Sequence, residues 1–489
     1  MELGSWWMVF TTLGAAFVTM FWLVKRANEW FFTRKLGNKQ YLLPPGDMGW
    51  PLIGNMWSFL FAFKYGDPDS FISSFVNRFG RTGIYKALMF GNPSVIVTMP
   101  ETCRQVLMDD KRFRQGWPKA TYELLGKKSF MSLSDEEHKR LRRLTASPIR
   151  GQEALSMYHE YIKEVIITSL DEWSSREQPF EFLTEIRKIT FKIIMYIFLS
   201  VDSGPMLETM EKLYTDLNHG IRAMAINVPG FAYHKAIKGR KKLVKILQDV
   251  VEGRRTRKKS DGSEKDKDMM VLLIETEDEN GGRLDNEEII DIILVYLNAG
   301  HESSAHALMW VTLFLHDHPE HFLKAKAEQE ELVKRREPTE TELSLRETKQ
   351  MEYLSKVIDE TMRIANISLL TFREASTDVN IGGYLVPQGW KVLVWFRAVH
   401  LDSENHLNPT KFDPQRWDAD KPKAGSYIPF GTGSRLCPGS ELTKLEISTF
   451  LHYFLLSYKL ERINPGCSVR YLPHVSPKDN CLARIKKLS

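Results

Sequence analysis

Cysteine is scarce in this chain, and its 67 basic and 62 acidic residues leave little net charge. The 489 residues include four cysteines, and no two of them form a CxxC pair. This spacing argues against a zinc site or a disulfide scaffold and fits a reducing compartment. The net charge of +5 is small for the length, so nucleic acid is not expected as a partner. Internal repeats and low-complexity tracts are also absent, and no shift in composition divides the chain cleanly.

Long uncharged apolar runs are rare as well, and one stands at the N-terminus. Trp6 to Val24 is uncharged over 19 residues, which as a helix spans roughly 28 Å, about one hydrocarbon core. We therefore predict a single transmembrane signal anchor over residues 5–24. A cleaved signal peptide is the alternative, but the run lacks a basic segment before it and a small-x-small cleavage site. The basic residues after it predict a cytosolic protein body: Lys25, Arg26, Arg34, Lys35 and Lys39.

Residues 25–51 read as a basic, proline-rich hinge. Pro44, Pro45 and Gly46, followed by Pro51, cannot continue a helix. Residues 52–489 have mostly helical periodicity, with strand-like runs at 82–85, 94–98 and 379–392. We expect one catalytic domain there, mainly α with small β sheets.

The most informative segment lies near the C-terminus, at residues 430–439, and reads FGTGSRLCPG. Its composition is that of a loop holding haem iron through the thiolate of Cys437, which favours O–O cleavage. Phe430 is expected to pack on the macrocycle, and Arg435 to pair with a haem propionate. A helix predicted over 442–460 would steady the anion through its N-terminal amides. The alternative is a glycine-rich turn beside a buried cysteine.

A long helix is predicted from a capping box at Asp285 and Glu288 to the residue before Pro319. Its segment 289–297 is apolar nearly all round, so it should pass through the core. Gly300 then permits close approach or a local opening. The adjacent Glu302 and Ser303 are predicted to relay protons to bound dioxygen. Simple packing of small residues in a buried helix is the alternative.

Two further sets of charged residues are spaced for a function. Glu360 and Arg363 lie three apart in a helical run, and with Arg416 are predicted to form a buried network bracing the cysteine loop. A surface ion pair is the alternative.

His138 and Arg142 lie four apart on a basic helix predicted over 136–144, and with Arg373 and Arg435 are expected to bind the propionates. The other bases of that helix would face outward and dock an acidic electron donor: Lys139, Arg140 and Arg143.

The AGxE[ST], ExxR, PxRW and FxxGxRxCxG patterns occur together and in this order along the chain, so it resembles the cytochrome P-450 family of haem-thiolate monooxygenases. The resemblance covers the whole chain. It implies a prism-shaped, mainly α fold, haem b, dioxygen, and electrons from an NADPH–cytochrome P-450 reductase at the endoplasmic reticulum membrane.

Four segments resemble plant ent-kaurenoic acid oxidases of gibberellin synthesis and relatives that oxidise triterpenes: 44–51, 139–146, 229–236 and 479–484. The last substrate loop departs from the oxidases, which have an arginine where this chain has Ser476. Losing that cation would cost an acid substrate roughly 2–5 kcal/mol. A tetracyclic, largely neutral triterpene is therefore the preferred substrate and ent-kaurenoic acid the alternative, with Lys119 or Arg222 as other sources of a cation.

The resemblance also implies a substrate pocket, formed by Tyr122, Leu125, Met224, Val228, Ala299, Ile367, Leu369, Leu370 and Val475. Two other classes share the haem-thiolate loop: enzymes that rearrange oxygenated substrates without dioxygen, and non-catalytic haem or sterol carriers. The rearranging enzymes commonly lose the acid–alcohol pair and the carriers would not need it, so Glu302 and Ser303 favour a monooxygenase.

Overall fold

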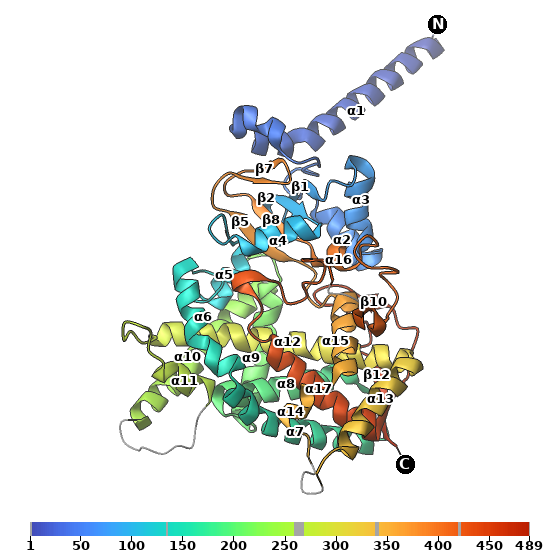
Figure 1. Ribbon diagram of the computed structural model, residues 1–489. Coiled ribbons are helices and arrows are strands. Elements are labelled where there is room, and N and C mark those ends of the chain that lie inside the picture. Colours follow the sequence, from blue (N-terminus) through green and yellow to red (C-terminus); the bar gives the residue numbers. More distant parts are fainter. Residues whose placement is uncertain (1, 134, 259–267, 338–341, 419–421, 489) are drawn as a thin grey trace. The chain divides into compact units, whose positions relative to one another are not determined.

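The computed structural model describes residues 2–133, 135–258, 268–337, 342–418 and 422–488. The chain forms two compact units. The first consists of Met1–Gly116, Leu369–Val399 and Lys423–Ser426, and the second of Trp117–Ser368, His400–Pro422 and Tyr427–Ser489. Helices predominate and the sheets are small, which confirms the predicted class (Figure 1).

The first unit is built on a five-stranded sheet of order β1-β2-β8-β5-β3. The neighbours are antiparallel except for β2 and β8. Its strands are β1 Ile84–Met89, β2 Asn92–Val97, β3 Phe113–Gln115, β5 Thr371–Ala375 and β8 Lys391–Val394, with a separate hairpin of β6 Val379–Ile381 and β7 Tyr384–Val386. Its helices are α2 Met56–Tyr65, α3 Asp69–Phe79 and α4 Pro100–Met108, and α16 Phe396–His400 begins in it. The predicted strand-like runs correspond to β1, β2 and β6 to β8.

The N-terminal helix α1, Glu2–Thr33, extends beyond the predicted end of the apolar run at Val24. It continues because residues 25–33 contain neither proline nor glycine, and the short helix η1, Arg34–Leu42, precedes the prolines. The predicted hinge 25–51 is therefore helical over its first part. In the described portion of the chain, no helix combines the length and apolarity needed to span a bilayer.

The second unit is mainly helical. Its helices are α5 Lys119–Leu125, α6 Asp135–Arg150, α7 Gln152–Ser175, α8 Phe182–Leu199, α9 Pro205–Ile221, α10 Ala232–Lys258, α11 Met269–Glu275, α12 Asn286–Asp317, α13 Pro319–Lys334, α14 Leu345–Thr348, α15 Glu352–Ala365, η2 Pro414–Asp418, η3 Gly433–Arg435 and α17 Ser440–Ser457. Its two small sheets comprise β4 Phe180–Glu181, β12 Leu482–Lys487 and β9 Tyr458–Arg462, and β10 Val469–Arg470 with β11 Ser476–Pro477.

Helix α12 runs through the core of this unit (Figure 1). It begins at Asn286 with the predicted capping box of Asp285 and Glu288, and every residue from Ile289 to Leu297 is buried. It packs against α8, α15 and α17. A Cβ added at Gly300 would lie 3.0 Å from Ile194 Cδ1, so this glycine permits the close approach of α8. The helix is regular through Gly300, so the local opening considered from the sequence does not occur.

Candidate active site

The cysteine loop is folded tightly by backbone hydrogen bonds. The Cys437 amide donates to the Phe430 carbonyl at 2.9 Å, and the Gly431 amide to the Ile428 carbonyl at 3.0 Å. Gly431 and Gly433 have φ values of +74° and +76°, which residues with a Cβ rarely adopt. The loop therefore requires glycine at both positions and presents Cys437 just before the N-terminus of α17.

Opposing influences act on the Cys437 thiol. Burial raises its pKa, while the amides of Gly439 and Ser440 and the charge of Arg142 lower it. A thiolate formed here has these amides and one guanidinium to stabilise it. Because burial dominates, the thiol is protonated when no metal is bound, and metal binding would displace its proton.

Helix α6 brings two of the predicted propionate-binding residues to this loop. Arg142 donates to the Leu436 carbonyl beside the cysteine. His138, one turn earlier, is buried, and its ring centroid lies 5.8 Å from that of Phe130. Arg435 is also directed at this helix and pairs with Asp135 at 2.7 Å. The cysteine loop and the basic face of α6 therefore form one electropositive site.

The other predicted cations differ in their surroundings. Arg373 belongs to the first unit, where it is buried on β5 and donates to Gln115 Oε1 at 3.0 Å. Arg140 does not face outward as expected, because Asp278 and Glu288 pair with it at 2.8 and 3.1 Å. Arg143 is exposed, so the outward basic face is smaller than predicted.

The second set of charged residues forms a buried network. Arg363 binds both carboxylate oxygens of Glu360 at 2.8 and 2.9 Å, and both side chains are fully buried. Arg416 Nε approaches the same carboxylate at 3.3 Å. Arg363 Nη1 also donates to two backbone carbonyls, that of His400 at 2.8 Å and that of Pro409 at 2.6 Å.

His400 connects this network to the cysteine loop, and sequence reasoning missed it. Burial lowers its pKa to about 3, so the ring is neutral. Its Nε2 accepts a hydrogen bond from the Ile428 amide at 3.0 Å, and its Nδ1 therefore carries the proton and donates to Asn366 Oδ1 at 2.7 Å. Ile428 in turn accepts from Gly431. No spacing rule relates His400 to residues 428–431, so the sequence held no signal for it.

The middle of α12 presents an accessible face in an otherwise buried helix. Ala299 is exposed and Ser303, one turn on, is half-buried. The Ser303 hydroxyl donates to the Ala299 carbonyl at 2.6 Å. Glu302 points elsewhere, since Arg187 on α8 binds its carboxylate at 3.1 Å.

Burial raises the pKa of Glu302, but the charge of Arg187 and of nearby groups outweighs it and lowers the pKa overall. The predicted acid–alcohol pair is thus adjacent in sequence, while the ionised Glu302 is held in an ion pair.

The predicted pocket residues vary widely in exposure. Leu125 and Val475 are buried, whereas Met224 is 77% and Val228 50% exposed. The intermediate positions are Tyr122 and Ile367 in the second unit, and Leu369 and Leu370 in the first. The Val475 carbonyl accepts from Trp310 Nε1 of α12 at 2.7 Å, which fixes the loop 471–477 on that helix.

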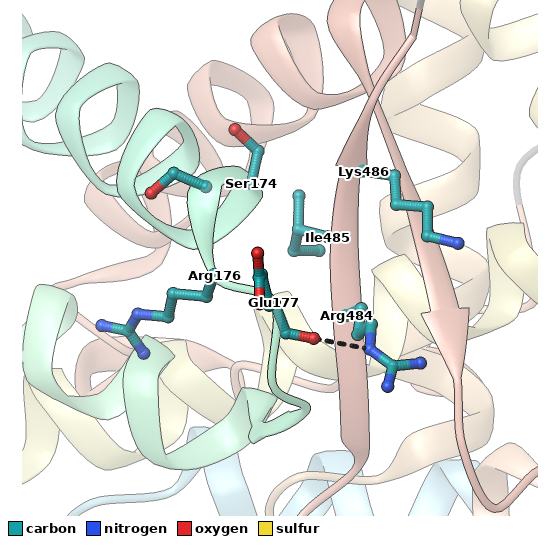
Figure 2. Close-up of a pocket in the computed structure, with 7 residues that line it drawn as sticks. Ser174, Arg176, Glu177, Arg484, Ile485 and Lys486 are labelled. Atoms are coloured by element: carbon teal, nitrogen blue, oxygen red, sulfur yellow. Dashed lines mark hydrogen bonds between the residues drawn. The ribbon is translucent and has the colours of Figure 1, made fainter.

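A surface pocket of about 360 Å³ lies away from these residues, between the end of α7 and β12 (Figure 2). Arg484 Nε donates there to the Glu177 carbonyl at 3.0 Å, and Arg176 pairs with Glu172 and Glu185. None of the predicted site residues lines this pocket, so we do not assign chemistry to it.

The loop suits a cofactor that needs one protein ligand. Among the described residues, no group of three or more His, Cys, Asp or Glu side chains is placed to chelate a metal. A Cβ added at Gly431 or Gly439 would meet no described atom within 4 Å, so there is free space beside the loop. A single thiol, adjacent space and nearby cations match the needs of an anionic iron porphyrin.

Comparisons with known proteins agree with this geometry. The family model described as Cytochrome P450 matches residues 44–471. The chain is 57% identical to ent-kaurenoic acid oxidase 2 of Arabidopsis thaliana over 486 residues, 99% of each chain. It is 54% identical to 7,8-epoxymelianol synthase CYP88A154 of Ailanthus altissima over 491 residues, 100% of this chain and 98% of that relative. A solved structure, retinoic acid bound cyanobacterial CYP120A1, matches with a TM-score of 0.81 and 25% identity, over 91% of this chain and 99% of that one.

Proposed function

This chain belongs to the cytochrome P450 family, and we propose that it inserts an oxygen atom from O2 into a tetracyclic triterpene. As a monooxygenase of this family it uses a cysteine-ligated haem, with electrons from NADPH supplied through a reductase. The observation that carries the assignment is the Cys437 loop, in which glycines with positive φ, two amides and Arg142 surround one thiol.

The chain's own residues perform four tasks in this proposal. Cys437 would ligate the haem iron through its thiolate, and a thiolate-ligated haem would supply the chemistry of O–O cleavage. The haem propionates would be held by His138, Arg142, Arg373 and Arg435, and Phe430 would pack on the macrocycle. Glu360, Arg363 and Arg416 keep the loop in place through His400.

Proton delivery is assigned to α12. The Ser303 hydroxyl, on the accessible face, is the last donor. Its bond to the Ala299 carbonyl holds the proton along the helix until the hydroxyl rotates. Glu302 lies behind it, and the ion pair with Arg187 keeps its carboxylate charged between turnovers.

The triterpene is preferred to ent-kaurenoic acid because of Ser476. The side chain is fully buried and its hydroxyl lies 3.2 Å from Arg470 Nη2, so it supplies no charge to a substrate. Ent-kaurenoic acid is the second candidate, favoured by Arg222, whose guanidinium lies near Glu302. The names of the relatives include both activities.

Product analysis separates the candidates. Membranes containing this protein and a reductase would be given NADPH and either ent-kaurenoic acid or a panel of tetracyclic triterpenes. We expect a hydroxylated or epoxidised triterpene, and much less product with Ser303→Ala at equal NADPH consumption. Efficient turnover of ent-kaurenoic acid would reverse the preference, and product without NADPH would exclude a monooxygenase.

We further propose that residues 5–24 anchor the protein in the endoplasmic reticulum membrane with the catalytic domain in the cytosol. The support is the uncharged run followed by basic residues. The exposed bases Lys139 and Arg143 would contribute to docking the reductase. Full-length protein should resist alkaline carbonate extraction, while a chain beginning at residue 25 should be released more readily.

A further inference from the structure

Two arginines, two histidines and one carboxylate meet beside the accessible face of α12. Arg187 binds Glu302 at 3.1 Å, and its Nη2 lies 3.4 Å from His306 Nε2. The ring centroids of His306 and His474 lie 4.7 Å apart. Arg222, the residue that ends α9, is hydrogen-bonded through Nη2 to His474 Nε2. We call these five residues the basic cluster.

The hydrogen bonds fix the protonation states of the two imidazoles. A guanidinium only donates, so His474 Nε2 accepts from Arg222 and His474 Nδ1 carries the proton. That Nδ1 faces the Ile367 carbonyl at 3.3 Å. His306 is arranged likewise, with Nδ1 donating to the Glu302 carbonyl at 2.7 Å and Nε2 facing Arg187. Burial lowers the pKa of both rings, His306 to about 4, so both are neutral.

The cluster therefore has an excess of positive charge. Two guanidinium groups face the single carboxylate of Glu302, which Arg187 already binds. Within the described residues, no carboxylate lies within 4.0 Å of the Arg222 guanidinium. Its hydrogen bond to His474 uses one of five N–H donors and no charge. Arg222 thus has donors available to a ligand.

Arg222 is also accessible in an enclosed setting. The side chain is exposed to solvent, yet burial is the main cause that lowers the pKa of its guanidinium. A cation that water reaches but protein surrounds binds an oxygen acceptor more strongly than one on an open surface. The exposed Met224 and Val228 follow it on the same segment and offer apolar contacts.

We propose that Arg222, oriented by His474, anchors the substrate of the proposed monooxygenase by binding an acceptor oxygen at one end of the terpenoid. This inference rests on the proposed function. The group bound is a carboxylate, carbonyl or hydroxyl oxygen, with the carboxylate bound most strongly because it neutralises the excess charge. The His474 ring connects this anchor to Ile367, so the oxygen-bearing end is held on the side of the pocket where the loop 471–477 meets α12.

The anchor gives the chain a cation that position 476 lacks. An arginine at 476 would reach the substrate from the loop, whereas Arg222 reaches it from the end of α9. The oxygen-bearing end then lies at a different point relative to the reacting centre, and a different carbon is presented for oxidation. This arrangement therefore predicts that the substrate-binding cation has moved from position 476 to Arg222 and has not been lost.

Ligand-induced changes in the haem spectrum of the holoenzyme give the dissociation constants needed for a test. The ligands are ent-kaurenoic acid, the alcohol obtained by reducing its carboxyl group, and the parent hydrocarbon with neither oxygen. The variants are Arg222→Gln, Arg222→Lys and the control Lys235→Gln, which removes an exposed cation paired with Asp216 at 2.7 Å.

We expect Arg222→Gln to weaken the acid about 10- to 100-fold, the alcohol less, and the hydrocarbon less than about twofold. Arg222→Lys should restore part of the affinity for the acid, and Lys235→Gln should change the affinity for none of the three ligands. If Arg222→Gln weakens all three ligands alike, or none, the anchor is wrong while the proposed function stands. If neither these three ligands nor any triterpene of the product-analysis panel perturbs the wild-type spectrum, the proposed function fails and the anchor with it.

Discussion

Glu446 offers a quantitative test of the packing between α12 and α17. The side chain is buried on α17, and in the described part of the chain neither carboxyl oxygen has a well-formed hydrogen bond. Burial raises its pKa from 4.5 to about 8, and Ser304 of α12 opposes this only in part. The folded protein therefore holds this carboxyl protonated at neutral pH.

The sign of the pH dependence follows from proton binding. Between pH 4.5 and 8 the unfolded chain has lost this proton and the folded protein keeps it, so stability falls as pH rises. The stability that the folded protein gains by keeping the Glu446 proton is fully present below pH 4.5 and is lost as the pH rises to about 8. The slope is about 1.4 kcal/mol per pH unit well below pH 8 and half of that at pH 8, which gives about 2.3 kcal/mol between pH 6 and 8. With an unfolding entropy of about 1 kcal/mol/K for this length, the midpoint shifts by about 2 °C.

The variant Glu446→Gln removes the titration while keeping the shape of the side chain. Thermal midpoints of the haem-loaded protein would be measured at pH 6, 7 and 8, at one scan rate because unfolding of a chain this long is seldom reversible. The control is Glu441→Gln, an exposed position on the same helix. Wild type and control should lose about 2 °C more than Glu446→Gln between pH 6 and 8. An equal loss in all three proteins would refute a protonated, buried Glu446.

Three further predictions concern the site. Cys437→Ala should abolish the thiolate-type spectrum of the reduced carbon monoxide complex, and a retained spectrum would refute the ligand assignment. Arg187→Gln removes the main cation that lowers the pKa of Glu302 while burial still raises it, so the acid limb of the pH–rate profile should move to higher pH; an unmoved limb would exclude Glu302 from proton delivery. Glu360→Gln leaves Arg363 buried without a counter-ion, which should cost roughly 3–5 kcal/mol and lower the thermal midpoint; an unchanged midpoint would contradict the network.

Local features were predictable where neighbouring residues determine the backbone. The capping box at Asp285 fixes the start of α12 because both partners lie within one turn. The positive φ values of Gly431 and Gly433 are local in the same sense, because glycine adopts them without a steric penalty. The buried pairing of Glu360 with Arg363 needed only helical spacing, together with one distant residue, Arg416.

Side-chain orientation could not be predicted where the partner comes from another element. Glu302 points toward Arg187 because α8 packs against α12, and no local pattern relates residues so far apart. Arg140 was expected to face solvent, but its guanidinium forms ion pairs with Asp278 and Glu288. In both cases helical periodicity predicts on which side of the helix a residue lies, but not which residue of another element it contacts.

The network around Glu360 restricts how this enzyme can diversify. One carboxylate serves two guanidinium groups, and Arg363 also binds carbonyls far along the chain. Replacing any one member leaves a buried charge without its partner. Exchanging the whole network by single mutations would therefore pass through strongly destabilised intermediates. Ala299 and Met224 are exposed and uncharged, so replacing them leaves no buried charge unpaired. Selection for new substrates is therefore channelled to the pocket, while the frame beneath the cysteine stays fixed.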